Sequence, residues 1–172
     1  MVSDAPLKTA VDSFDAWRTE LLLVGNIVQD EDDSVPWPDR EARFNRYVAM
    51  VDAVSGEEGV ATAAALIQSV QARHDYGAYQ ATHHALGRFP SDVYVAALLQ
   101  ELPALIQRSR DWAGELLCGL ANSVGTRFAS QIGEFRRQLD AAPSKIRETV
   151  VRFIKSEEEA GWLRHRRGVL AP

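Results

Sequence analysis

Apolar residues recur with the period of an α-helix along almost the whole chain, and this pattern constrains the fold more than any other feature. Phe44, Tyr47, Val48 and Val51, for example, stand at positions i, i+3, i+4 and i+7. Such spacing places apolar side chains on one face of a helix, which must then pack against a neighbour. No segment shows convincing strand-like alternation. The sequence therefore predicts an all-α fold.

Proline, glycine and polar breaks divide this pattern into short helical segments. We expect helices at 6–25, 38–55, 57–73, 76–89, 92–101, 103–107 and 111–121, and two longer ones around 128–139 and 143–159. Short helices with short connections are typical of stacked helical pairs such as HEAT-like units of about 40 residues. Because the amino-acid sequence does not repeat regularly, we expect an irregular HEAT-like stack or bundle of about eight helices. It forms a single domain over 1–172, with a basic, frayed tail at 163–172.

Size and charge narrow the class of protein. The chain has 172 residues, 46% of them hydrophobic and 25% charged, as expected for one soluble globular domain. The net charge of −5 argues against direct binding to nucleic acid phosphates. Residues 1–101 carry 16 acidic and 7 basic side chains, whereas residues 102–172 carry 8 acidic and 12 basic ones. An acidic front half suits a cationic partner.

The sequence shows no pattern that would target the chain to secretion or to a membrane, so we expect a cytoplasmic protein. The N-terminal residues lack a charged start followed by an apolar stretch, so we expect no secretory signal. No apolar run approaches the roughly 20 residues that span a bilayer, so we expect no membrane association. The single cysteine, Cys118, lies in an apolar run and is interpreted as a small core hydrophobe.

Signatures of catalysis are missing from the sequence. There is no glycine-rich phosphate loop, no nucleophile elbow and no metal-binding pair of histidines at helical spacing. The neighbouring His83 and His84 point about 100° apart on a helix, so they do not ligate one ion together. We therefore expect no catalytic, cofactor or metal-binding residues, and interpret one histidine as packed and the other as exposed.

The segment QDEDDSVPWP, residues 29–38, is the best candidate for partner contact. Four consecutive acids and two prolines oppose helix formation here, which predicts a loop. Trp37 stands between two prolines and has no amphipathic face of its own. It is either a half-buried anchor of the loop or an interface residue, a role in which tryptophan is enriched. Together, Asp30, Glu31, Asp32, Asp33 and Trp37 would steer and then anchor a cationic partner.

Two further acids, Glu57 and Glu58, complete the candidate partner-binding set. They are expected in the first turn of a helix, where the helix dipole favours negative charge and gives them a structural role as well. The other tryptophans, Trp17, Trp112 and Trp162, lie on apolar helical stripes and are expected in the core.

Residues 79–122 resemble a known family, the family-30 immunity proteins of bacterial polymorphic toxin systems. The shared pattern is an apolar helix ending near a histidine and a phenylalanine, a Tyr-x-x-x-Leu-Leu helix, a Leu-Pro-x-Leu turn and a Trp-Ala-x-x-Leu-Leu helix closing on asparagine. The matching positions are His83 or His84, Phe89, Tyr94, Leu98, Leu99, Leu102, Pro103, Leu105, Trp112, Ala113, Leu116, Leu117 and Asn122. The resemblance covers about a quarter of the chain.

The resemblance implies a protein that binds the toxic domain of a cognate effector and blocks it sterically, without catalysis. An acidic face would suit a basic toxin such as a nuclease. The alternative is a HEAT-like helical adaptor or scaffold without a toxin partner. An all-helical enzyme ranks last, because Glu101 and His83 have no catalytic partner in the pattern.

Overall fold

The computed structural model describes residues 14–171 and confirms the all-α class, because these residues form eight α-helices, one short 3₁₀ helix and no strand. The predicted start of the first helix at Pro6 lies outside the described residues. The α-helices are α1 (Phe14–Gly25), α2 (Trp37–Asp52), α3 (Val60–Gln68), α4 (Ala78–Leu86), α5 (Ser91–Arg108), α6 (Arg110–Ala121), α7 (Ser130–Ala141) and α8 (Ser144–Ala160). The 3₁₀ helix η2 (Arg164–Arg166) follows.

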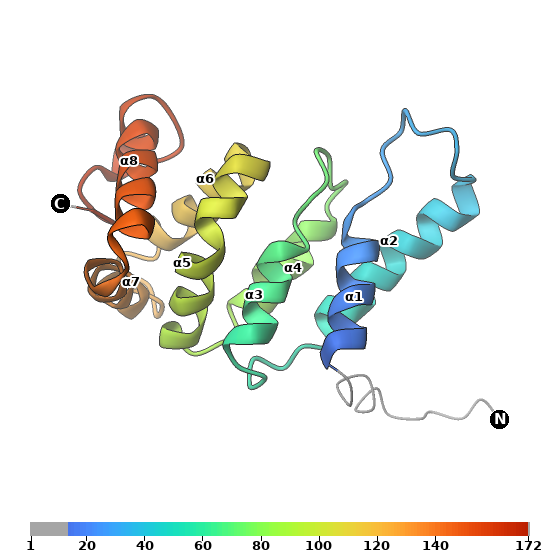
Figure 1. The fold of residues 1–172 in the computed structure, drawn as a ribbon, viewed down its shortest axis with the longest axis horizontal. Helices are drawn as coiled ribbons and strands as arrows, with labels where there is room; N and C mark the ends of the chain where they lie inside the picture. Colours follow the sequence, from blue (N-terminus) through green and yellow to red (C-terminus); the bar gives the residue numbers. More distant parts are fainter. Residues whose placement is uncertain (1–13, 172) are drawn as a thin grey trace.

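The helices form a row of stacked pairs, from α1 and α2 at one end to α7 and α8 at the other (Figure 1). Along the row, α1 packs on α3, α3 on α5 and α5 on α7, while α2 packs on α4. Helix α5 also contacts α6 and α8, so it is the central helix of the second half. This arrangement is the predicted irregular stack. The loops before α2 and before α4 lie at the same edge of it (Figure 1).

Helix α3 shows how the sequence produces the core. Its sequence VATAAALIQ is apolar on nearly every face, and Ala63, Ala64, Ala65, Leu66 and Ile67 are all buried. A helix without a polar face must be covered on several sides, and α3 lies between α1 and α5. The three alanines let neighbouring backbones approach closely. Full burial of a leucine such as Leu66 stabilises the folded state by about 1.5–3 kcal/mol relative to an exposed side chain.

Two buried tyrosines join the helices through their hydroxyl groups. The Tyr47 hydroxyl, on α2, lies 2.9 Å from Ser69 Oγ and 2.5 Å from Thr82 Oγ1. The Tyr79 hydroxyl donates to the Gly25 carbonyl (2.7 Å) and accepts from the backbone N–H of Gln71 (3.0 Å) and of Ala72 (2.8 Å). The two rings meet edge to face, with centroids 5.7 Å apart. These contacts fix the relative positions of α1, α2 and α4.

Pro103 corrects one predicted boundary. The sequence predicts a break between helices at 92–101 and 103–107, but the structure has one helix, α5, with Pro103 inside it. Proline cannot donate the usual hydrogen bond to the carbonyl four residues earlier, so an interior proline is costly in an isolated helix. Here α5 packs against α3, α6, α7 and α8, and this packing outweighs the local preference.

Other predicted helices are shorter in the structure. The segments predicted at 57–73 and 76–89 contract to Val60–Gln68 and Ala78–Leu86. Trp37 is predicted in the loop but is the first residue of α2. Pro38 therefore lies in the first turn of the helix, where a backbone N–H would have no partner within the helix, so a proline is tolerated. Phe128 lies before α7 rather than within it.

The C-terminal tail is packed, contrary to the expected fraying. Leu163 and Leu170 are each 1% exposed. The Arg136 guanidinium, on α7, donates to the carbonyls of Val169 (2.9 Å) and Gly168 (2.6 Å). Because backbone acceptors of the tail are bonded to α7, its positive charges are carried on an ordered surface.

Trp162 is not the core residue that the sequence predicts. It follows α8 outside any helix and is 48% exposed. Its indole covers Gly114 of α6, where an added Cβ would lie only 2.4 Å from the Trp162 Cδ1. Nearby, the buried Glu157 accepts hydrogen bonds from the Arg110 guanidinium and from the Trp162 backbone N–H. By contrast Trp17 is buried, as predicted, and Trp112 is partly buried against the core.

None of the helices within residues 14–171 is long and apolar enough to cross a membrane.

Candidate partner-binding site

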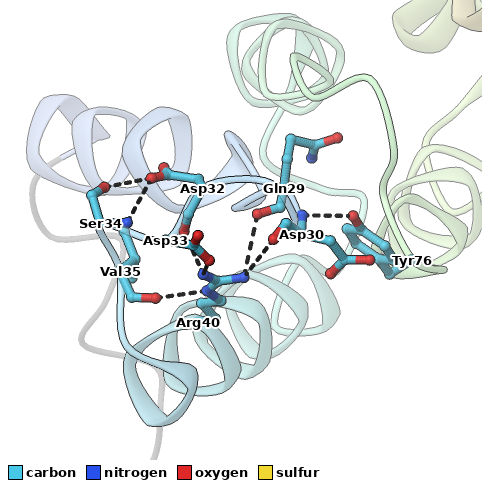
Figure 2. Close-up of polar contacts among 8 residues, drawn as sticks. All are labelled: Gln29, Asp30, Asp32, Asp33, Ser34, Val35, Arg40 and Tyr76. Carbon is cyan, nitrogen blue, oxygen red and sulfur yellow. Dashed lines mark hydrogen bonds and ion pairs between the residues drawn. The ribbon is translucent and has the colours of Figure 1, made fainter.

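The acidic loop between α1 and α2 is held in shape by one arginine of α2 (Figure 2). The Arg40 guanidinium donates to the backbone carbonyls of Val35 (2.6 Å), Asp30 (3.3 Å) and Gln29 (3.4 Å), and also to that of Asp32. Its side chain is only 17% exposed, so the loop wraps around it. Arg40 thus stabilises the loop backbone, and most of its N–H donors are already hydrogen-bonded.

The same loop is fastened to the segment that precedes α4. The Gln29 carboxamide donates to the His74 carbonyl (2.8 Å) and accepts from the His74 backbone N–H (3.0 Å). The backbone N–H of Asp30 donates to the Tyr76 hydroxyl (3.1 Å; Figure 2). These contacts join residues about 45 positions apart in the chain. The loop is therefore fixed at both its start and its middle.

The carboxylates of the loop face solvent. The Asp33 side chain is fully exposed, and its Oδ1 lies 3.8 Å from Arg40 Nη2, a weak contact at this exposure. The Asp32 carboxylate accepts hydrogen bonds from the Ser34 hydroxyl and from the Ser34 backbone N–H, and these bonds lower the pKa of Asp32. Asp30 and Glu31 are also exposed. With the backbone bonded inward, the negative charge of the loop remains available at the surface.

A groove of about 340 Å³ lies beside this loop. Its surface is mainly apolar, and two carboxylates, those of Asp30 and Glu41, belong to its lining. The remaining lining residues are Ile27, Val28, Trp37, Arg40, Phe44, Asn45 and Tyr76. The groove combines an apolar surface with carboxylates at its edge, which suits a cationic group that carries an aliphatic or aromatic stem.

Two large aromatic side chains of this groove are exposed. Trp37 is 70% exposed and Tyr76 is 48% exposed. Trp37 is therefore not the half-buried loop anchor that the sequence leaves open, and its indole is free to contact another molecule. Exposed tryptophan and tyrosine beside a groove are the residue types that most often dominate binding energy at protein interfaces.

Glu57 and Glu58 do not belong to this site. They precede α3, at the opposite end of α2 from Trp37. A helix of 16 residues is roughly 24 Å long, so the two acidic groups are well separated. The Glu58 carboxylate accepts hydrogen bonds from the Ser55 backbone N–H (2.7 Å) and hydroxyl (2.9 Å) and from the Gly56 backbone N–H (2.8 Å).

The bonding of Glu58 indicates a structural role. Partial burial by itself would raise the pKa of Glu58, but the hydrogen bonds from Ser55 and Gly56 outweigh it and lower the pKa. Glu57 is exposed, and its backbone N–H donates to the Ser55 hydroxyl (3.2 Å). The structure thus separates the seven predicted residues into a cluster of five around the loop and a distant pair.

Sequence reasoning missed Tyr76, Phe44 and Arg40. Tyr76 was expected to begin a helix, but it lies in the turn before α4 with a positive φ of 49°. Gly77, which directly follows, is a general turn signal, but it does not indicate a positive φ at Tyr76. Arg40 gave no signal, because only the folded loop brings the carbonyl groups around it.

Within residues 14–171, no three His, Cys, Asp or Glu side chains converge in a way that could hold a metal ion. No protein-family model matches the sequence, and neither a curated protein nor a solved structure matches it.

Proposed function

We propose that the protein is an immunity protein, which binds a cognate bacterial toxin domain and neutralises it by steric occlusion. The observation that carries this proposal is the ordered acidic loop beside a groove with an exposed tryptophan. The resemblance of residues 79–122 to immunity family 30 supports the same function. Occlusion requires a complementary surface and no reaction.

Charge favours a basic partner. The loop and the adjacent start of α2 expose Asp30, Glu31, Asp33, Asp39 and Glu41. The nearest arginine, Arg40, already donates to loop carbonyls and offsets little of this charge at the surface. A positively charged toxin, such as a nuclease whose own site must attract phosphates, would be steered toward this face. Complementary charge mainly raises the association rate and selects the partner.

The ordered loop favours tight binding. A flexible acidic loop would lose conformational freedom when a partner binds, which weakens affinity. Here Arg40, Gln29 and Tyr76 already fix the backbone. Trp37 can then supply contact area in a groove whose shape exists before binding. In pre-organised complexes, such as those of proteases with their inhibitors, the interface backbone moves little on binding.

Co-expression tests the proposal directly. The toxin domain encoded beside this gene would be expressed in a sensitive bacterial cell, with and without the present chain. We expect survival only when the chain is present, and co-purification of the two proteins. Cell death despite a normal level of folded chain would reject neutralisation and favour the helical adaptor.

Two surface variants test whether the acidic loop and Trp37 form the toxin-binding surface. Trp37→Ala should weaken the complex about 30-fold or more, as expected for a hot-spot tryptophan. Asp30→Lys combined with Asp33→Lys should slow association and reduce its dependence on salt. The matched control reverses Glu148 and Glu159, two exposed acids of α8, and should leave association unchanged. Equal effects of the two charge reversals would remove the loop from the interface.

A further inference from the structure

A second, smaller pocket lies between α4, α5, α6 and α7, in a different part of the stack from the acidic loop. Its volume is about 140 Å³. Apolar side chains of Leu86, Leu116, Leu120 and Phe128 form much of its wall. Gly87 and Gly119 also line it. Gly119 is exposed, and an added Cβ there would meet no described heavy atom within 4 Å, so a side chain at this position fits without a clash.

Three polar side chains also line this pocket, and none of their polar atoms has a hydrogen-bond partner within residues 14–171. Tyr94 and Gln131 are both 7% exposed, and the Tyr94 hydroxyl and the Gln131 carboxamide make no hydrogen bond within residues 14–171; their polar atoms keep some contact with solvent. His83 stacks edge-on against Trp112, and its buried Nε2 has no partner in the same part of the chain. The His83 Nε2 is thus a buried polar atom without a bond to the described residues, and leaving such an atom unbonded costs about 1–3 kcal/mol.

The contrast with the other buried tyrosines gives this observation its weight. Tyr47 and Tyr79 are completely buried, and their hydroxyls make two and three hydrogen bonds, respectively. The fold therefore satisfies tyrosine hydroxyls where they are purely structural. The three unbonded groups at the pocket instead converge on one space from α4, α5 and α7. That convergence marks a site prepared for a ligand.

The lining determines the charge of the ligand. Among the residues that the structure describes, no Asp, Glu, Lys or Arg side chain lines the pocket. Burial lowers the pKa of His83, against the opposing effect of Glu115 and Asp75, so the imidazole is neutral near pH 7. Burial also raises the pKa of Tyr94, so its hydroxyl stays protonated. A charged ligand would lose its hydration without gaining a counter-charge, which disfavours it.

The volume determines the size of the ligand. A cavity of roughly 150 Å³ with apolar walls holds one benzene molecule. The present pocket has nearly this volume and adds a hydroxyl and a carboxamide at its surface. We propose that it binds a small uncharged ring that carries one oxygen, with phenol as the simplest example. The ring contacts the leucines and Phe128, and its oxygen exchanges hydrogen bonds with Tyr94 and Gln131.

This site is independent of the proposed toxin-binding face, so each can fail without the other. Phenol, benzene and benzoate provide matched probes, because they share a ring and differ in the oxygen or the charge. Each would be titrated into the full chain labelled with ¹⁵N, while the amide resonances of Gly87 and Gly119 are followed. We expect saturable shifts with phenol, about five- to tenfold weaker binding of benzene, and weaker binding still of benzoate.

Three variants test the position of the ligand. Gly119→Leu adds a bulky side chain at the lining of the pocket and should abolish phenol binding. Gly133→Leu is the matched control, because Gly133 is a helical glycine of α7 that also has open space around its Cβ and does not line the pocket. Tyr94→Phe should keep benzene binding and remove most of the preference for phenol.

Other results would overturn the proposal. If phenol, benzene and benzoate cause equal or unsaturable shifts, the pocket has no specificity for an uncharged oxygen-bearing ring. If the folded Gly119→Leu protein binds phenol as tightly as the control variant, the ligand lies elsewhere. If Tyr94→Phe retains the full preference for phenol, the hydroxyl does not contact the oxygen.

Discussion

The three buried tyrosines provide a test of whether hydrogen bonding, rather than burial, determines the contribution of a hydroxyl to stability. Tyr47 and Tyr79 are completely buried and Tyr94 is 7% exposed, so burial is almost constant. Burial raises the pKa of all three phenols, so each hydroxyl is protonated at neutral pH. They differ in the number of bonds: three for Tyr79, two for Tyr47 and none for Tyr94 within the described residues.

Replacement by phenylalanine removes only the hydroxyl in each case. A net contribution of about 1 kcal/mol per hydrogen bond predicts a loss of about 3 kcal/mol for Tyr79→Phe. That variant leaves the backbone N–H groups of Gln71 and Ala72 without their partner, whereas the Gly25 carbonyl keeps its hydrogen bond from the Ile27 backbone N–H (2.9 Å). Tyr47→Phe should lower the free energy of unfolding by about 2 kcal/mol, because it removes two hydrogen bonds. Thr82 then loses its partner, whereas the Ser69 hydroxyl keeps its bond to the Leu66 carbonyl. Tyr94→Phe should be neutral or stabilising by up to about 1 kcal/mol.

Urea denaturation at 25 °C, followed by far-ultraviolet circular dichroism, measures these differences. The three variants should share the slope of the wild-type transition and differ only in midpoint, which shows that stability alone has changed. A loss for Tyr94→Phe as large as that for Tyr79→Phe would refute the reasoning, because the unbonded hydroxyl would then be stabilising. The same result would remove the basis for a ligand at Tyr94.

Two further predictions concern the loop before α3. Gly56 and Gly59 both have a positive φ, +96° and +87°, respectively. A Cβ added at Gly56 would lie 2.5 Å from the Arg88 carbonyl oxygen. A Cβ added at Gly59 would meet no described heavy atom within 4 Å. Gly59→Ala should cost about 1–3 kcal/mol by urea denaturation, because its backbone (φ 87°, ψ −174°) lies in a region that is essentially restricted to glycine. Gly56→Ala should cost about 1–3 kcal/mol more than Gly59→Ala, because its Cβ also meets the Arg88 backbone, and equal losses would contradict this close approach. The pKa of Glu58 is lowered in the folded protein, so its ionised form adds stability above the ordinary value of about 4.3, and this stability is lost as the pH falls through the folded value. The difference in unfolding midpoint between wild type and Glu58→Gln should thus be largest near pH 7 and shrink below about pH 4, and a difference that stays constant with pH would contradict this role.

The amino-acid pattern by itself determined the class of the fold and the inward face of most helices. Val51 and Tyr47 of α2 and Phe135 and Leu139 of α7 are buried at the positions that their helical spacing predicts. This works because helical periodicity is a local property, written at intervals of three and four residues. The acidic loop was predictable for the same reason, since consecutive acids and prolines oppose helix wherever they stand.

Tertiary structure alone decided which chain segments meet. Pro103 predicts a break from local preference, and only the packing of α5 among four other helices shows why the helix continues. Tyr76 joins the groove because its loop lies beside a loop 46 residues away, and no local pattern records that neighbour. Arg40 becomes the centre of the acidic loop because the folded backbone turns its carbonyls inward. Likewise, Tyr94 and Gln131 become a possible ligand site only when α5 and α7 bring them to one pocket. Periodicity specifies which face of a helix is buried, but long-range packing specifies what it is buried against.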